Sequence, residues 1–241
     1  MKTIVITGST DGIGKLVAIQ LAKEGHQLLL HGRNPEKLQK TLSEVKALSS
    51  NENLTGIVAD LSDLESVKTM ISQLSKALPV IDVLINNAGV FNSPIEQNKD
   101  RLDIRFVVNY FAVYLLTNGL LSSLRNSKAP RLINLSSAAQ SSISFDALAG
   151  KKILDAREAY AQSKLALTMW SFDLAEKHNF LNVIAVNPGS LLNTRMVKEA
   201  FGKFWSPAEK GATILYELAT LEKYTESSGK YFDNDKGSFS N

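Results

Sequence analysis

Short apolar segments alternate with longer amphipathic segments along most of this chain. Near-continuous apolar runs are typical of strands in a parallel sheet that is covered on both faces. The segments that we predict as strands are 4–6, 27–30, 54–59, 80–85, 131–135 and 181–186. Apolar positions at helical spacing lie between them, and the predicted helices are 13–24, 35–48, 64–78, 101–121 and 157–178.

Strands that alternate with helices in this way predict an α/β fold with right-handed crossovers. We expect a Rossmann-type, doubly wound parallel sheet of about seven strands in the order 3-2-1-4-5-6-7. With 241 residues, 44% of them hydrophobic, the chain can bury one substantial core, so we expect a single domain over residues 1–241. Residues 233–241 form a polar tail that we expect to fray.

The composition and charge of the chain narrow the function classes. The formal net charge is only +3 and no block of basic residues stands out, which disfavours nucleic acid or an anionic membrane as the main partner. The chain has no cysteine, so disulfides and thiolate chemistry are excluded. Its three histidines are scattered and no carboxylate spacing indicates a metal site, so we expect no metal.

We also expect a cytoplasmic protein with no membrane span. The longest apolar run, 106–116, is interrupted by Asn109 and is too short to cross a bilayer. The first residues run directly into a predicted strand and lack the apolar region of a signal peptide.

Three glycines connect the first predicted strand to the first predicted helix, with the spacing Gly8-x-x-x-Gly12-x-Gly14. The first allows a tight turn, the second lets the backbone approach a pyrophosphate, and the third lets the helix pack closely on the strand. The helix N-terminus would offer N–H groups and a positive dipole end to a phosphate. Leu16 stands where a P-loop requires a hydroxyl for magnesium, so this is not a P-loop.

The end of the second strand distinguishes NAD from NADP, because an acid there binds the ribose 2′-hydroxyl whereas an arginine accommodates a 2′-phosphate. No Asp or Glu lies between Gly25 and Pro35, and the segment contains Arg33. We therefore predict NADP as the favoured cofactor and Arg33 as the 2′-phosphate ligand, a solvated loop arginine being the alternative. Asn34 is the expected N-cap of the next helix.

Tyr160 and Lys164 are four residues apart on a predicted helix, so their side chains share one face. A phenol has a pKa near 10, and an ammonium about 4 Å away would stabilise its ionised form by roughly 4 kcal/mol at an effective dielectric near 20. Tyr160 could then act as the general acid in ketone reduction or the general base in alcohol oxidation.

Further fragments follow the glycine motif in a fixed order: Asn86-Asn87-Ala88-Gly89, then Asn109, then Ser136-Ser137, then the tyrosine and lysine just described. Together they resemble the short-chain dehydrogenase/reductase family, from Lys2 to about Tyr231. The resemblance implies a nicotinamide-dependent oxidoreductase that transfers hydride between the nicotinamide C4 and a carbonyl or alcohol carbon.

The resemblance also implies a role for each residue of the site. Asn109 would distort its helix and hold a water that links Lys164 to solvent, although a buried amide bonded to nearby backbone is the alternative. Ser137 would orient the substrate oxygen, with Ser136 as the runner-up, and Lys164 would also bind the nicotinamide ribose. The expected cofactor-binding residues, which include Arg33 and the glycine loop, are Gly8, Ser9, Thr10, Gly12, Ile13, Gly14, Arg33, Asn34, Asp60, Leu61, Asn87, Ala88, Gly89, Tyr160, Lys164, Pro188, Gly189 and Thr194.

Two features depart from the commonest family pattern. Ser137 precedes Tyr160 by 23 residues, and the long segment 140–158 resembles the insert of retinol-dehydrogenase-like members, where we expect it to border the substrate cleft. Thr194 follows the Asn187-Pro188-Gly189 motif one residue later than the usual nicotinamide-contacting threonine, so Asn193 could take its place.

The segment 189–206 is the expected substrate lid, and its apolar residues suggest a lipophilic carbonyl or alcohol substrate, plain packing being the alternative. These residues are Leu191, Leu192, Met196, Val197, Phe201, Phe204 and Trp205. The segments 106–116 and 165–172 are apolar around most of a helix, which predicts a homodimer or homotetramer. Two other interpretations are a non-catalytic NADP-binding sensor or scaffold, and a nucleotide-sugar epimerase or dehydratase, which has a different glycine spacing and a larger C-terminal region.

Overall fold

One eight-stranded sheet forms the centre of the protein, in a computed structural model that describes residues 1–240 apart from the side chain of Phe201. Its strands are β1 Thr3–Ile6, β2 Gln27–Gly32, β3 Leu54–Val58, β4 Val83–Asn86, β5 Arg131–Leu135, β6 Asn182–Asn187, β7 Lys230–Asp233 and β8 Ser238–Ser240. The order is β3-β2-β1-β4-β5-β6-β7-β8, and every pair is parallel except β7 and β8. The predicted α/β Rossmann-type fold and the order of its first seven strands are confirmed.

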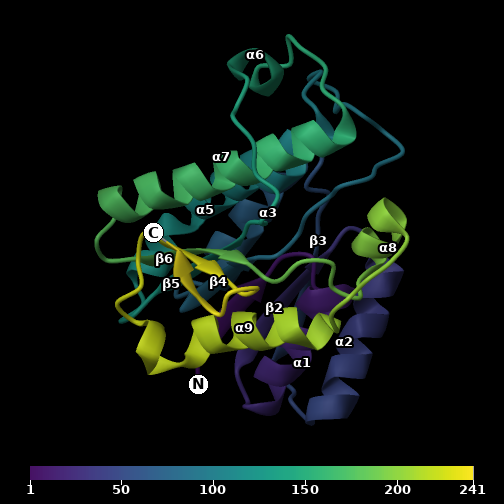
Figure 1. Cartoon of the computed structure of the whole chain (residues 1–241). Coiled ribbons are helices and arrows are strands. Elements are labelled where there is room, and N and C mark those ends of the chain that lie inside the picture. Colours follow the sequence, from purple (N-terminus) through teal and green to yellow (C-terminus); the bar gives the residue numbers. More distant parts are fainter. Residues whose placement is uncertain (241) are drawn as a thin grey trace.

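Helices cover both faces of this sheet (Figure 1). They are α1 Gly12–Lys23, α2 Pro35–Ser49, α3 Leu64–Ala77, α4 Ile104–Phe106, the π-helix η1 Val107–Phe111, α5 Ala112–Arg125, α6 Phe145–Leu148, α7 Ala156–Lys177, α8 Arg195–Phe201, α9 Ala208–Thr220 and the 3₁₀ helix η2 Glu222–Tyr224. The apolar faces of α1, α2 and α9 share one buried cluster with the sheet, and those of α3, α5 and α7 share another.

Local capping explains where the helices near the site begin. The Asp11 side chain accepts the N–H of Gly12 at the start of α1, and the Asn34 side chain accepts the N–H of Lys37 at the start of α2, as predicted. The Asp155 side chain accepts two backbone N–H groups at the start of α7. This last cap fixes the first turn of the helix that carries the predicted catalytic tyrosine.

The C-terminal tail does not fray as expected over its described part. Residues 238–240 form β8, which pairs antiparallel with β7. The ring of Phe239 packs edge-on against Phe232 at a centroid distance of 5.1 Å. The polar composition of the tail gave no signal for this hairpin. One aromatic side chain and a short ladder of backbone hydrogen bonds are enough to hold it on the sheet. Asn241 lies outside the described residues.

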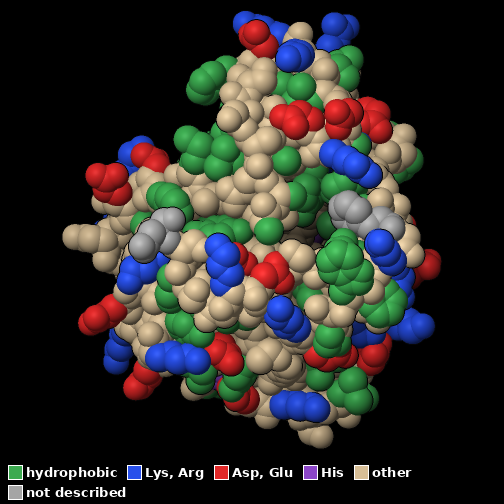
Figure 2. Space-filling view, in the orientation of Figure 1, with side chains coloured by type: hydrophobic (Ala, Val, Ile, Leu, Met, Phe, Trp, Pro, Cys, Tyr) green, Lys and Arg blue, Asp and Glu red, His purple; other side chains and the backbone are tan. Residues whose placement is uncertain are grey.

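The helix that begins at Ile104 continues to Arg125 and is therefore longer than the apolar run 106–116 from which the length was judged. By length and hydropathy this 22-residue helix would suffice to cross a membrane, so the argument from insufficient length is wrong. However, 56% of its most apolar window is buried inside the protein. Basic and acidic side chains are interspersed on the face shown in Figure 2, which carries no continuous basic patch.

Candidate active site

The glycine loop and the Asn87-Ala88 segment after β4 interlock closely. The Nδ2 of Asn87 donates to the carbonyls of Thr7 and Gly8, each at 2.9 Å. A Cβ on Gly14 would lie 2.3 Å from that same Nδ2, and a Cβ on Gly8, whose φ is +63°, would lie 2.7 Å from the Cα of Ala88. Two sequence motifs about eighty residues apart therefore form one rigid unit at the carboxyl edge of the sheet, where ligands bind in this class of fold.

A cavity of about 450 Å³ lies along this edge and contains most of the predicted cofactor-binding residues. Those that line it are Gly8, Thr10, Gly12, Ile13, Gly14, Arg33, Asp60, Leu61, Asn87, Ala88, Gly89, Tyr160, Lys164, Pro188 and Thr194. An adjoining recess shares Thr10, Asp11, Arg33 and Arg195 with the cavity. Its charged lining consists of Arg33, Lys37, Lys40, Arg195, Asp11 and Glu36, and Asn34 also borders it.

Ser9 and Gly189, two of the predicted cofactor-binding residues, do not line the cavity. Ser9 is fully buried, and its hydroxyl donates to the carbonyl of His31 at 3.2 Å while accepting that residue's N–H at 2.9 Å. Gly189 adopts a φ of +121° in the turn after β6, where the Asn187 side chain accepts its N–H at 3.2 Å. Both residues stabilise the loops that surround the cavity without lining it.

The two candidate serines differ in how their hydroxyls are used. Ser136 is 3% exposed, and its hydroxyl bonds the Lys164 carbonyl at 3.1 Å and the Thr168 hydroxyl at 2.6 Å. Although Ser136 contributes to the cavity wall, these bonds tie its hydroxyl to α7. Ser137 is half-buried, its Oγ accepts the Ala139 N–H at 3.1 Å, and its side chain is close enough to the Tyr160 phenol to lower the pKa of that group. Ser137 is therefore the serine whose side chain acts on the tyrosine, although Ser136 and not Ser137 lines the cavity.

Tyr160 and Lys164 both line the cavity from α7, with the Lys164 Nζ 5.6 Å from the centroid of the Tyr160 ring. Burial raises the pKa of Tyr160, and the bond to Ser137 opposes that rise. Burial also lowers the pKa of Lys164 to about 8, and its Nζ donates to the Leu135 carbonyl at 2.7 Å. In the protein without cofactor, burial thus has a larger effect on the pKa of Tyr160 than the effect expected from the Lys164 ammonium. The phenol therefore stays protonated at neutral pH.

Asn109 lies within the π-helix η1, so the expected helix distortion is present. Its side chain is fully buried and bonds Val90 twice, since Oδ1 accepts the N–H at 2.8 Å and Nδ2 donates to the carbonyl at 3.0 Å. Nδ2 also donates to the Ser163 hydroxyl at 3.0 Å. Asn109 does not line the cavity; it fixes the segment after Gly89, and its part in proton supply stays a prediction.

The predicted lid contributes fewer residues to the cavity than expected. Thr194 caps α8 and its Cγ2 lies 3.6 Å from where a Cβ on Gly12 would stand, whereas Asn193 is exposed, so Thr194 is the better placed of the two. Of the apolar lid residues whose side chains the structure describes, only Met196 lines the cavity. Leu192 is 2% exposed and packs inward, and Trp205 is 72% exposed. The side chain of Phe201 lies outside the described part of the chain.

Several residues that bear on the site carry no sequence signal that singles them out. The ring of His31 is 3% exposed, accepts the Gly8 N–H at Nδ1 (3.0 Å) and contacts the Ala59 carbonyl through Nε2 (3.0 Å). The Tyr231 hydroxyl donates to the Ser137 carbonyl at 2.9 Å. The Phe91 ring packs against that of Tyr160, with centroids 4.9 Å apart. Each reaches the site from a distant segment, so only the fold reveals it.

Comparisons with known proteins agree with this geometry. The profile of the family described as short chain dehydrogenase matches residues 2–203. Retinol dehydrogenase 13 of Mus musculus is 34% identical over 252 residues, which cover 96% of this chain and 75% of that protein. Polyprenol dehydrogenase of Homo sapiens is 30% identical over 257 residues, with coverage of 98% and 77%. The predicted likeness to retinol-dehydrogenase-like proteins is confirmed.

Two solved structures with bound cofactor share the fold. A short chain dehydrogenase from Shigella flexneri complexed with NADP superposes with a TM-score of 0.78 at 28% identity, and covers 97% of each chain. Another from Escherichia coli complexed with NADPH has a TM-score of 0.80 at 26% identity, and covers 97% of this chain and 96% of that one.

Proposed function

The chain belongs to the short-chain dehydrogenase family and is an NAD(P)-dependent oxidoreductase, and from this premise we propose that it prefers NADP(H) and interconverts a lipophilic alcohol and its carbonyl. The observation that carries the proposal is that Tyr160 and Lys164 line one cavity together with the glycine loop, while the Ser137 side chain lies beside the Tyr160 phenol. Turnover of NADPH with a panel of aldehydes and ketones tests it. Binding of NADPH without any turnover would favour the sensor interpretation instead.

The residues at the carboxyl edge of the sheet suit a dinucleotide phosphate. Ile13 and Gly14 belong to the first turn of α1, whose N–H groups have no partner within the helix and favour an anion. In the recess beside Arg33, four cationic side chains outnumber two carboxylates. When bound, NADPH supplies the hydride.

The protein's own groups would orient the substrate and supply the proton. Ser137 would hydrogen-bond the substrate oxygen together with the Tyr160 phenol. Because burial raises the pKa of Tyr160, the phenol holds its proton at neutral pH and can donate it as the carbonyl oxygen gains electrons. Lys164, whose burial lowers its pKa to about 8, would bind the nicotinamide ribose and stabilise the phenolate that results.

The lipophilic substrate is proposed from the cavity wall and from the relatives. The apolar residues that line the cavity near Tyr160 are Val90, Phe91, Pro94, Ile95, Ile104, Val108 and Met196, and the polar residues Asn92, Ser93 and Glu199 line it as well. Retinol and polyprenol, after which two of the relatives are named, are long apolar alcohols. A chain-length series of alcohols and aldehydes would test this, and we expect kcat/KM to rise with apolar length.

Arg33→Ala should weaken NADPH binding selectively, if Arg33 binds the 2′-phosphate. The loss of one charged hydrogen bond predicts about 1.5–3 kcal/mol. Titration of the variant with NADPH and with NADH measures the effect, and NADH is the internal control because it has no 2′-phosphate. An equal loss for both cofactors would remove Arg33 from this role.

We propose a homodimer or homotetramer that is assembled through the outer face of α5 and α7. Three large apolar side chains are exposed there: Tyr114 at 42%, Met169 at 55% and Phe172 at 40%. The Tyr114 ring packs on Trp170 of the neighbouring helix, which makes the patch continuous across both. Light scattering at micromolar concentration should give at least twice the 26.4 kDa chain mass, and Met169→Glu should shift it towards the monomer. A monomeric wild type would refute the proposal.

We further propose that the protein is cytoplasmic and does not span a membrane, since the apolar helix 104–125 is largely covered by the rest of the fold. Fractionation of cells that express the full chain tests this. Recovery in the membrane pellet after a carbonate wash would contradict it.

A further inference from the structure

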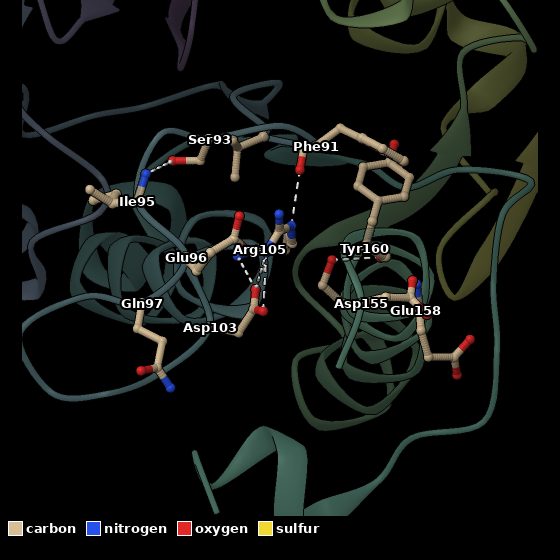
Figure 3. A network of polar contacts seen from close by, with 12 residues as sticks. Phe91, Ser93, Ile95, Glu96, Gln97, Asp103, Arg105, Asp155, Glu158 and Tyr160 are labelled. Atoms are coloured by element: carbon tan, nitrogen blue, oxygen red, sulfur yellow. Dashed lines mark hydrogen bonds and ion pairs between the residues drawn. The ribbon is translucent and has the colours of Figure 1, made fainter. Parts of the chain in front are cut away.

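Arg105 is a buried arginine next to the site, with a side-chain exposure of only 1%. Figure 3 shows its guanidinium between the segment after β4 and the start of α4. Its Nε donates to the Phe91 carbonyl at 2.9 Å. Its Nη1 donates to the carboxylate of Glu96 and, at 3.2 Å, to that of Asp103. One planar group thus joins three points of a single loop.

We call residues 91–103 the wall loop, because its first five residues line the cavity. The loop folds back on itself: the Ile104 N–H donates to the Glu96 carbonyl at 2.9 Å, and the Asn98 N–H donates to the Leu102 carbonyl at 2.9 Å. Asp103 caps the end of the loop by accepting the Arg105 N–H at 2.8 Å. Arg105 therefore lies at the base of the loop and closes it.

The wall loop places an aromatic ring on the predicted catalytic tyrosine. Phe91 is 8% exposed, and its ring is tilted by 50° on that of Tyr160 at a centroid distance of 4.9 Å. The preceding residue, Val90, is fixed through both backbone groups by Asn109. Phe91 is thus held from one side by Asn109 and from the other by Arg105.

We propose that Arg105 is a positioning residue for the reaction: by closing the wall loop it fixes the Phe91 ring against Tyr160, and so sets the orientation of the phenol towards the substrate. This inference rests on the proposed function in taking Tyr160 as the proton donor. A guanidinium is suited to the task because its planar fork of donors reaches a carbonyl and two carboxylates together, which a lysine ammonium on a flexible stem cannot do.

A single buried ion pair is weak evidence for stability, because desolvation offsets its Coulomb energy. The control must therefore separate positioning from stability, and the chain offers a matched one. Arg131 is 4% exposed and its guanidinium donates to the Leu218 and Leu221 carbonyls, each at 2.8 Å, at the opposite end of the sheet from the cavity. Arg131→Lys removes a comparable buried guanidinium from the same fold.

The experiment compares Arg105→Lys, Arg131→Lys, Phe91→Ala and the Arg105→Lys/Phe91→Ala double variant. We expect both lysine variants to lower Tm, but only Arg105→Lys to lower kcat, by roughly 10- to 100-fold as for other small misplacements of a reacting group. The Kd for NADPH should stay within about twofold, since the glycine loop is not involved. Because Arg105 acts through Phe91, the double variant should be no slower than the slower single variant.

Three results would overturn the proposal: an unchanged kcat in Arg105→Lys, a kcat loss of the same size in Arg131→Lys, or kcat losses that multiply in the double variant. A second measurement does not need turnover. Among the six tyrosines, the ¹³C resonance of Tyr160 can be assigned with Tyr160→Phe, and it should move in Arg105→Lys but not in Arg131→Lys. If wild type shows no turnover, the proposed function fails, while this resonance still decides whether Arg105 positions the ring.

Discussion

Tyr160→Phe should lower turnover by a factor on the order of 10²–10⁴, the usual contribution of a positioned acid or base. The change keeps the ring, its packing on Phe91 and the volume of the cavity wall, and it removes only the hydroxyl that Ser137 contacts. Cofactor affinity should therefore remain close to that of wild type. Steady-state kinetics with NADPH and a good carbonyl substrate, together with a binding titration, measure both quantities.

Tyr224→Phe is the matched control for this change. Tyr224 is also buried, at 8% exposure, and its hydroxyl donates to Glu217 at 3.1 Å, but it does not line the cavity. We expect it to affect Tm and leave kcat unchanged. Near-normal carbonyl reduction by Tyr160→Phe would exclude Tyr160 as the proton donor and would favour a binding function for the site.

The parts of the fold and site that sequence predicts well are those set by local chemistry. Gly8, Gly12 and Gly14 follow a strand and open a helix, so their position at the cavity follows from a turn of a few residues. Tyr160 and Lys164 face the same way because four residues make about one helical turn. The alternation of strands and helices predicted a parallel sheet, because parallel strands need crossover helices, and the strand order then came from the known order of the Rossmann-type fold.

Features that depend on distant segments were missed or misplaced. Ser9 lies one residue from Thr10, yet it faces His31 in the interior while Thr10 lines the cavity, since the turn after β1 decides which side chain points inward. Likewise, nothing in the sequence distinguishes Arg105 from a solvent-exposed arginine, because its burial depends on the folded wall loop. Local periodicity carries no information about such contacts.

The sequence also could not predict which of the two adjacent serines, Ser136 or Ser137, interacts with Tyr160. Both serines follow the end of β5 and face α7, but the Ser136 hydroxyl bonds the Lys164 carbonyl and the Thr168 hydroxyl, whereas the Ser137 side chain acts on the Tyr160 phenol one turn nearer the start of the helix. Which of the two does so depends on where β5 ends relative to α7. That relation is set by packing over the whole sheet.

Lys164→Met should impair the protein more than Tyr160→Phe, because Lys164 has two assigned roles and Tyr160 has one. Methionine retains the length and apolar bulk of the stem but removes the ammonium that would stabilise the phenolate and bind the nicotinamide ribose. We expect kcat to fall by more than in Tyr160→Phe, and NADPH affinity, measured by fluorescence titration, to fall as well. Unchanged NADPH affinity would rule out the ribose contact.

A stability measurement shows whether Lys164→Met acts on chemistry rather than on the fold. Burial lowers the pKa of Lys164 from 10.5 to about 8, so between these values the unfolded chain binds more protons than the folded one. Stability from this group therefore rises as the pH increases from about 8 to 10.5, and below pH 8 the folded state carries the cost of a buried charge.

Methionine removes that cost but leaves the Leu135 carbonyl without the donor that bonds it at 2.7 Å. We expect the difference in Tm between wild type and variant to change in favour of wild type from pH 7 to pH 10. A pH-independent difference would mean that Lys164 is not a buried titrating group, and the catalytic role built on its burial would fail with it.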